Sequence, residues 1–322
     1  MSELRFLPPM RMHPAYRHGD MTPWGGEQLK TVFGKDIPDD RTGEALEMSV
    51  IPGLESTDDN GETLTALIER YGSRLTGLPE GTEFPLLLKL LAARGSLSVQ
   101  VHPDDEYAKV HENKLGKTEA WVILHAEEGA SLLYGIREGV TIDDLRRALT
   151  GGEDVEPLIQ RVQVKAGDVF YMPAGMVHAI GGGILLYEIQ QSSDVTYRLW
   201  DFNRVNAKGE KRPLHIQQSL DVIRPELKGL RAHMPEHPAQ EITRLLDVPA
   251  FTLDCVAADG ACILPAAETF RVLTALEPLT LRWLEGEMEL KAGDTVLLPA
   301  ACPEVGLEGH GRALVSGVGR NA

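Results

Sequence analysis

Cysteine is scarce in this sequence. The 322 residues include three, Cys255, Cys262 and Cys302. Their number is odd and no two have the CxxC spacing, so neither a disulfide framework nor a cysteine-type zinc site is expected. The first residues also lack the basic and then apolar layout of a secretory signal. We therefore expect a cytoplasmic protein.

Long apolar runs are missing as well. The longest, residues 85–93, is interrupted by Lys89 and falls far short of the roughly 20 residues needed to span a bilayer. Positive charge is the third shortage, because 32 Lys and Arg face 48 Asp and Glu and leave a formal charge of −16. This balance argues against nucleic acid and anionic membranes as partners. A negatively charged substrate would need a local cluster of positive groups.

What is present indicates a mainly β fold. Hydrophobic residues make up 43%, and 32 Gly and 20 Pro are spread along the chain, as expected for many short strands joined by tight turns. The pattern predicts strands at 96–101, 120–124, 131–136, 162–164, 168–173, 178–180 and 184–190, and again from 250 onward. It predicts helices at 63–71, 141–149, 156–161 and 215–223. The three glycines at 181–183 predict a tight hairpin.

A ten-residue unit occurs twice. Residues 165–174 (KAGDVFYMPA) resemble residues 291–300 (KAGDTVLLPA), which indicates two related β-modules, although two unrelated strand-turn units could also match by chance. The position of His178 after the first copy corresponds to Glu304 after the second. We predict a metal-binding domain over residues 1–239, including a connector at 205–239, and a degenerate β-domain without metal over residues 240–322.

Four residues form the strongest candidate site. Gln100 and His102 are two apart and so lie on one face of a strand, while Glu119 and His178 come from later strands that could converge in a barrel. Two imidazoles, a carboxylate and an amide oxygen suit zinc and would accept manganese, cobalt or iron. With one anionic ligand the site would keep a charge of about +1 and stabilise a substrate oxyanion. Taken singly, His102 could be a surface histidine and Glu119 a solvated residue.

A polar segment follows the His178 strand. Alternation places Glu188, Gln190 and Ser192 on one face. Arg198, flanked by Tyr197 and Trp200, could serve packing or face the same cavity.

At these residues the chain resembles the type I phosphomannose isomerases, also called mannose-6-phosphate isomerases, of the cupin superfamily, and more narrowly their short bacterial class. The resemblance covers nearly the whole chain. It rests on a series of motifs in order: Trp-Gly-Gly at 24–26, Phe-Pro-Leu-Leu-Leu-Lys at 84–89, Ser-Val-Gln-Val-His-Pro-Asp-Asp at 98–105, Lys-Thr-Glu at 117–119, Pro-Ala-Gly-Met-Val-His at 173–178 and Ser-Asp-Val-Thr-Tyr-Arg at 193–198.

The resemblance implies a cupin-type jelly-roll barrel with short helical insertions, and interconversion of mannose 6-phosphate and fructose 6-phosphate through a cis-enediolate. It implies one zinc ion per chain, held by Gln100, His102, Glu119 and His178. Catalytic positions match Lys117, Glu188, Asp194 and Arg198, and substrate-binding positions match Ser98 and Lys89. Two segments, 14–23 and 43–47, depart from the family pattern. A monomer or small homo-oligomer is expected. A cupin oxygenase and a non-catalytic sugar-phosphate-binding module are the alternatives.

Overall fold

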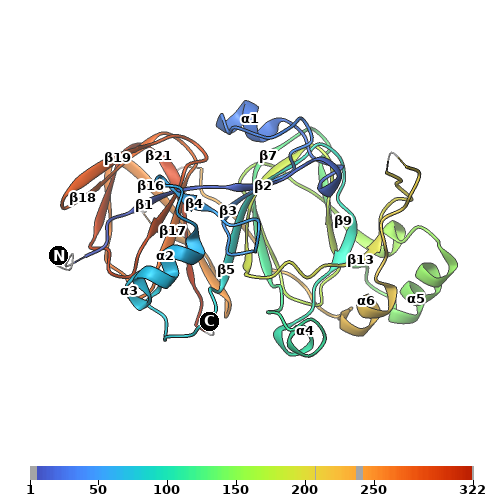
Figure 1. Ribbon diagram of the computed structural model, residues 1–322. Coiled ribbons are helices and arrows are strands. Elements are labelled where there is room, and N and C mark those ends of the chain that lie inside the picture. Colours follow the sequence, from blue (N-terminus) through green and yellow to red (C-terminus); the bar gives the residue numbers. More distant parts are fainter. Residues whose placement is uncertain (1–5, 207, 237–241, 321–322) are drawn as a thin grey trace.

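The computed structural model describes residues 6–206, 208–236 and 242–320 and is built mainly from three antiparallel β-sheets (Figure 1). The prediction of a mainly β fold is confirmed. The nine-stranded sheet lies on the left of Figure 1, and the other two sheets lie on the right. Among the described residues, no helix is both long enough and apolar enough to cross a membrane.

A seven-stranded sheet with the order β14-β10-β7-β12-β5-β3-β2 occupies the middle of the molecule. Its strands are β2 (Ala15–Arg17), β3 (Glu44–Met48), β5 (Leu86–Ala93), β7 (Glu119–Ala126), β10 (Asp168–Met172), β12 (Ile184–Gln191) and β14 (Arg231–His233). A five-stranded sheet has the order β13-β6-β11-β8-β9. Its strands are β6 (Val99–Val101), β8 (Ser131–Ile136), β9 (Ile159–Gln163), β11 (His178–Ile180) and β13 (Tyr197–Trp200). One hydrophobic cluster contains residues of both sheets, including Trp121, Leu186 and Leu132, so the two pack face to face.

The nine-stranded sheet joins both ends of the chain. Its strands are β1 (Met10–His13), β4 (Thr57–Asp58), β15 (Ile242–Asp247), β16 (Phe251–Leu264), β17 (Arg271–Ala275), β18 (Leu279–Trp283), β19 (Gly286–Leu290), β20 (Thr295–Leu298) and β21 (Val305–Val318). Strand β1 lies between β20 and β4, with Met10 opposite Leu297. The predicted domain boundary at residues 239 and 240 lies outside the described residues.

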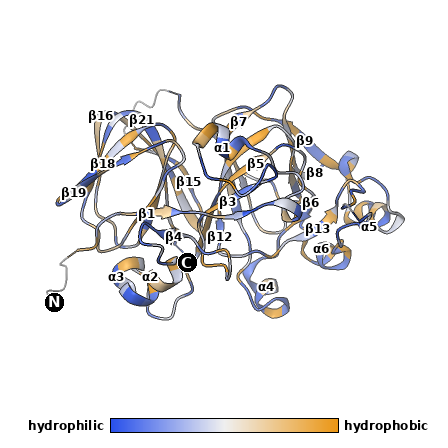
Figure 2. Cartoon of the chain, turned by 45° about the horizontal axis from the view of Figure 1, so that its top comes forward, coloured by the Kyte–Doolittle hydropathy of each residue, from blue (hydrophilic) through white to orange (hydrophobic). Residues whose placement is uncertain are grey.

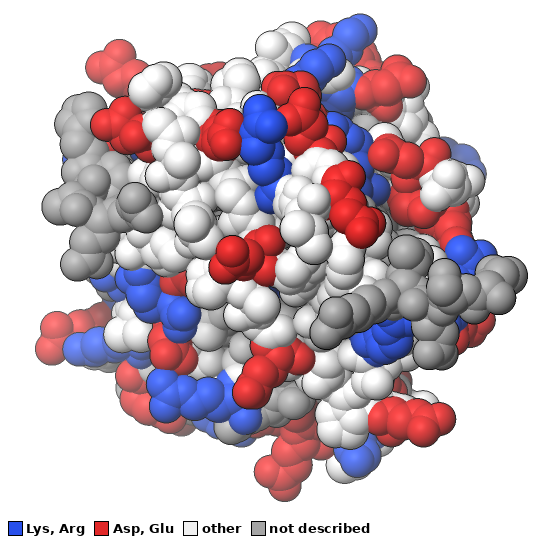
Figure 3. Space-filling view, turned by 90° about the vertical axis from the view of Figure 1, so that its left-hand side faces the viewer, with Lys and Arg blue, Asp and Glu red and all other residues white. Residues whose placement is uncertain are grey.

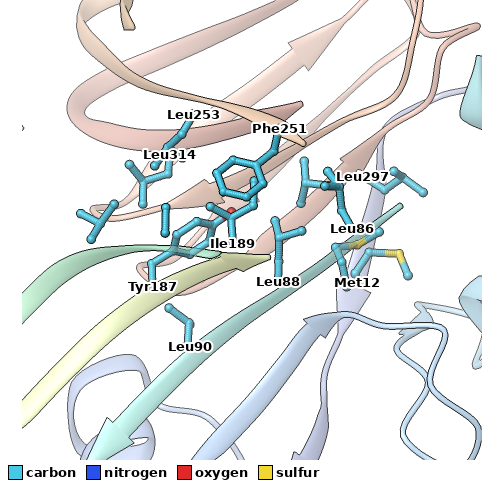
Figure 4. Close-up of a cluster of buried hydrophobic side chains, with 14 of the residues drawn as sticks. Met12, Leu86, Leu88, Leu90, Tyr187, Ile189, Phe251, Leu253, Leu297 and Leu314 are labelled. Carbon is cyan, nitrogen blue, oxygen red and sulfur yellow. The ribbon is translucent and has the colours of Figure 1, made fainter. Parts of the chain in front are cut away.

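Strand alternation gives the central sheet two different faces. On β5, Leu86, Leu88 and Leu90 belong to the same hydrophobic cluster as Phe251 and Leu314 of the nine-stranded sheet (Figure 4). Side chains on the opposite face of β5 point toward the five-stranded sheet. Burial on both faces explains the apolar run at residues 85–93, and Lys89 interrupts this run on the face toward the five-stranded sheet.

We expect Phe251→Ala to destabilise the protein without altering the face of the seven-stranded sheet that points toward the five-stranded sheet. The side chain is fully buried among leucines, so its truncation is expected to lower the free energy of unfolding by about 3–5 kcal/mol. Denaturant unfolding measures the change. Ile263→Ala is the control, because Ile263 is 60% exposed and its loss is expected to cost less than about 0.5 kcal/mol. Equal losses for the two variants would contradict this account of the packing.

Helices lie at the periphery. They are α1 (Gln28–Phe33), α2 (Leu64–Tyr71), α3 (Ser73–Thr76), α4 (Asp105–His111), α5 (Ile142–Gly151) and α6 (Ile216–Val222), with 3₁₀ turns η1 (Gly19–Met21) and η2 (Glu156–Leu158). The helix predicted at 141–149 is confirmed as α5. It begins with a capping box, in which the Thr141 hydroxyl accepts from the Asp144 amide and the Asp144 carboxylate accepts from the Thr141 amide. In Figure 2 the central strands β5 and β7 are mainly hydrophobic, whereas α4, α5 and α6 carry both kinds of residue.

Three local predictions are wrong. The helix expected at 156–161 is a single 3₁₀ turn, because Ile159 already pairs with Ile136 in strand β9. Strands resume before residue 250, with β14 at Arg231–His233 and β15 at Ile242–Asp247. Residues 181–183 do not form a hairpin, since β11 and β12 belong to different sheets. Instead they cross between the sheets, and a Cβ atom at Gly181 would lie 2.2 Å from the Ser131 carbonyl oxygen.

The repeated unit has the same local structure in both copies. The Lys165 amide donates to Asp168 Oδ2 at 3.0 Å, and the Lys291 amide donates to Asp294 Oδ2 at 2.9 Å. The glycine between them has a φ of 90° in the first copy and 85° in the second. Each turn leads into a strand, β10 or β20. The sequence repeat therefore corresponds to a structural repeat.

Candidate active site

Cross-strand register brings the candidate residues together between the seven-stranded and the five-stranded sheets. His178 and Arg198 lie on either side of Gln100, on β11 and β13. In the opposite sheet, Lys89 on β5 lies directly across from Glu188 on β12. The pairing of β12 with β7 places Gln190 opposite Glu119, at the start of β7. Each sheet thus contributes one half of the site.

His102, Glu119 and His178 form a compact buried group whose ligand atoms lie within 4.8 Å of one another. The Nε2 atoms of His102 and His178 are 3.4 and 3.1 Å from the two Glu119 oxygens. Each Nδ1 atom lies 2.9 Å from a backbone carbonyl oxygen, of Val195 and Met176 respectively. Because a carbonyl only accepts, Nδ1 carries the proton and Nε2 keeps a lone pair directed into the group.

The donor set fits a divalent metal. Both Glu119 oxygens are buried, and neither accepts a hydrogen bond of normal geometry from the described residues, although the Lys117 ammonium lies 2.8 Å from one of them. The Gln100 side chain reaches the group too, with its amide nitrogen 3.3 Å from His178 Nε2. Rotation of this amide would present its oxygen instead. All four residues predicted as ligands therefore lie together.

Electrostatics favour the protonation states that metal binding requires. Burial opposes ionisation of Glu119, but Lys117 and the two imidazoles hold the pKa of this carboxyl well below its usual range. Burial, reinforced by the charge of Lys117, also holds the pKa of His102 well below its usual value. Glu119 is therefore anionic and His102 neutral at physiological pH.

A row of alternating charges runs beside the metal-ligating group. Arg17 lies 3.2 Å from Glu44, and Glu44 lies 3.5 Å from Lys89. Lys89 lies 3.0 Å from Glu188, which is 4.0 Å from Lys117. Burial acts against ionisation of Lys89, but Glu188 and Glu44 raise its pKa. The row keeps buried charges paired and fixes the Glu188 carboxylate.

A cavity of about 380 Å³ opens onto this row, a size typical of small-ligand sites at roughly 300–1,000 Å³. The predicted residues that line it are Lys89, Ser98, Gln100, Lys117, Glu188, Asp194 and Arg198. The lining also includes five apolar residues: Met21, Trp24, Leu91, Leu97 and Ile180. Asp194 differs from the others, because the residue is exposed and its partly exposed carboxylate pairs with Lys114 at 2.5 Å.

Three charged residues of the cavity were not predicted: Arg17, Glu44 and Arg212. Arg17 and Glu44 lie directly opposite one another on β2 and β3, within the two segments that depart from the family pattern. Arg212 comes from the segment predicted as a connector. No local sequence motif marks these positions, since the pairing of distant strands and segments brings them to the cavity.

Comparison with known proteins identifies the family. Residues 11–128 match the family described as phosphomannose isomerase type I, catalytic domain. Mannose-6-phosphate isomerase ManA of Bacillus subtilis is 40% identical over 304 residues, which cover 91% of this chain and 94% of that protein. This chain belongs to the type I phosphomannose isomerase family.

Solved structures agree with this assignment. The crystal structure of the mannose 6-phosphate isomerase of Bacillus subtilis superposes with a TM-score of 0.87 at 32% identity, covering 97% of this chain and all of that one. A mannose 6-phosphate isomerase bound with zinc and yttrium has the same fold, with a TM-score of 0.76 at 16% identity over 97% of this chain and all of that one. The phosphomannose isomerase assignment thus extends over all three sheets.

Proposed function

We propose that this chain interconverts mannose 6-phosphate and fructose 6-phosphate in the cytoplasm, using one zinc ion. The observation that carries this proposal is a buried His-Glu-His group beside a cavity that Glu188 lines. Gln100 and Lys117 line the same cavity and reach the group, at 3.3 Å from His178 and 2.8 Å from Glu119. Family membership supports the same reaction. A monomer or small homo-oligomer stays a prediction.

His102, Glu119, His178 and the amide oxygen of Gln100 would hold the zinc ion. When bound, the ion supplies positive charge that stabilises negative oxygen on the substrate. The protein's part is to present neutral imidazole nitrogens and one carboxylate, and the carbonyl partners of the two histidines fix this arrangement.

The reaction moves one proton between neighbouring carbons of the open-chain sugar. Glu188 is the proposed base, and it removes the C2 proton of mannose 6-phosphate. The C–H electron pair forms the C1–C2 double bond, and O1 gains the negative charge of the enediolate. A proton passes from O2 to O1, and Glu188 returns its proton to C1 while the C2–O2 double bond forms, giving fructose 6-phosphate. Because one carboxylate serves both carbons, the transfer occurs on one face.

Cations of the cavity support this step. Lys117 lies 2.8 Å from Glu119 and within 4.0 Å of Glu188, so it can stabilise developing charge between the metal-ligating group and the base. Lys89 holds Glu188 in place at 3.0 Å. Arg198 donates to Ser98 Oγ at 3.3 Å and is proposed to contact substrate with it. Asp194, at the exposed side of the cavity, is proposed to assist ring opening.

A coupled assay with mannose 6-phosphate tests the proposal. We expect turnover that a chelator abolishes and added zinc restores, together with a higher melting temperature for the zinc-loaded protein, because a ligand bound to the folded state stabilises it. Oxygen consumption without isomerisation would favour a cupin oxygenase. Binding of mannose 6-phosphate without turnover would favour a binding module.

A further inference from the structure

Most cations that line the cavity are neutralised by carboxylates. Arg17, Lys89 and Lys117 each lie within 4 Å of a glutamate. Arg198 is different: its Nε donates to Ser98 Oγ at 3.3 Å and its Nη1 to the Pro213 carbonyl oxygen at 2.9 Å. Both acceptors are neutral. Across the described parts of the chain, no ion pair joins Arg198 to a carboxylate.

Arg212 lines the same cavity and is held in a fixed orientation. Its Nε donates to Asp201 Oδ2 at 2.8 Å and its Nη2 to Oδ1 at 2.5 Å, which is a two-pronged pair. Asp201 is buried and also accepts from Arg204. Two guanidinium groups, of Arg204 and Arg212, therefore share one carboxylate, and Arg198 lines the same cavity with no carboxylate partner among the described residues. Positive charge is in excess in this part of the site.

The segment that carries Arg212 is anchored to strand β13. The Arg198 amide donates to His215 Nδ1 at 3.1 Å, and the His215 amide donates to the Arg198 carbonyl oxygen at 2.8 Å. Burial lowers the pKa of Arg198, and the charge of Arg212 lowers it further, as expected for two guanidinium groups held close together. Such a pair is stable when an anion lies between its members.

We propose that Arg212, together with Arg198, binds the phosphate group of the substrate and so makes the enzyme selective for phosphorylated sugars. Arg212 Nη1 and Arg198 Nη2 are the terminal nitrogens for which no acceptor is found among the described residues. Each can donate two hydrogen bonds to phosphate oxygens. Lys and Arg lie interspersed with Asp and Glu on the side of the molecule formed by the nine-stranded sheet (Figure 3), and the formal charge of the chain is −16, so the anion is recognised by groups within the cavity and not by the overall charge. This inference rests on the proposed function for the identity of the sugar.

The test compares Arg212→Met with Arg146→Met in zinc-loaded protein. Arg146 lies on α5 with a 54% exposed side chain, so its variant makes the same change in net charge away from the cavity. For Arg212→Met we expect KM for mannose 6-phosphate to rise about 10- to 100-fold with little change in kcat. The reason is that the variant loses a charge-assisted contact to the phosphate group, and this contact is equally strong in the bound substrate and in the transition state. Turnover of unphosphorylated mannose is expected to keep its wild-type kcat/KM. Arg212→Lys is expected to restore part of the affinity, since lysine supplies charge without the planar fork.

Titration with inorganic phosphate provides a readout that needs no turnover. We expect calorimetry to show that Arg212→Met weakens phosphate binding about 10- to 100-fold and that Arg146→Met does not. Equal phosphate affinity in these two variants would overturn the assignment. So would a loss of kcat/KM for mannose as large as the loss for mannose 6-phosphate. If wild-type protein binds phosphate through Arg212 but does not isomerise the sugar, the anion site stands and the proposed reaction is wrong.

Discussion

Glu119→Gln is expected to lose bound zinc and with it about 1,000-fold or more of the isomerase activity. The substitution keeps the size of the side chain but removes the one anionic ligand of the proposed metal site. A neutral amide between two neutral imidazoles attracts a divalent cation poorly, and the enediolate would lose its main electrostatic stabilisation. Metal analysis of the purified variant and the coupled assay measure the two effects.

Glu47→Gln is the matched control for this variant. Glu47 is also a fully buried glutamate whose oxygens accept no hydrogen bond of normal geometry from the described residues, although the Lys35 ammonium lies 2.6 Å from one of them. It belongs to strand β3 but does not contact the metal-ligating group. We expect Glu47→Gln to lower stability while metal content and activity remain. Full zinc content and wild-type turnover in Glu119→Gln would exclude Glu119 as a ligand.

Glu188→Gln is expected to keep its zinc and lose turnover by about 100- to 10,000-fold, the range typical of a general base. The amide cannot accept a carbon-bound proton. Lys89 keeps a carboxylate partner in this variant, because Glu44 lies 3.5 Å away, and the local structure should therefore persist. Steady-state kinetics and metal analysis give the result, and the expected loss is in kcat.

Proton exchange separates the role of Glu188 from a role in binding. In deuterated water the wild-type enzyme is expected to incorporate deuterium at the carbon that receives the proton, to the extent that the Glu188 proton exchanges with solvent. Glu188→Gln should show neither isomerisation nor incorporation while still binding mannose 6-phosphate. A variant that retains zinc and turns over near the wild-type rate would show that another group is the base.

The ligand group could be predicted from the sequence because its geometry is largely local. Gln100 lies in strand β6 and His102 directly follows it, two residues later. His178 is the first residue of strand β11 and follows a short turn. Strands β7, β10 and β12 of the central sheet were predictable for a similar reason, since their side-chain pattern reflects burial of each strand. Strand β5, which is buried on both faces, was recognised only as an apolar run and not as a strand. The resemblance to the family then supplied roles for Lys117, Glu188 and Arg198, which spacing alone left open.

The remaining features depend on contacts between distant segments. Arg17 and Glu44 acquire their places through the pairing of β2 with β3, and Arg212 through the hydrogen bonds of His215 with β13. The glycines at 181–183 carry a turn signal that fits a hairpin as well as a crossing between sheets. The crossing between sheets differs from a hairpin in the close approach of Gly181 to Ser131, which the sequence does not reveal. Propensity and spacing contain no information about such approaches.

The pairing of β1 with β20 has a consequence for how the chain folds. Met10 and its partner Leu297 are 287 residues apart along the chain (297 − 10), so Met10 is made long before Leu297. The outer face of β5 and β12 packs against Phe251 and Leu314, so it stays uncovered until strands β16 and β21 have been made. Such long sequence separations make folding slow and leave apolar strands exposed in the nascent chain. The strands of the active-site sheet are all present once residue 233 has been made, but its outer face is covered only after the strands that carry Phe251 and Leu314 have followed.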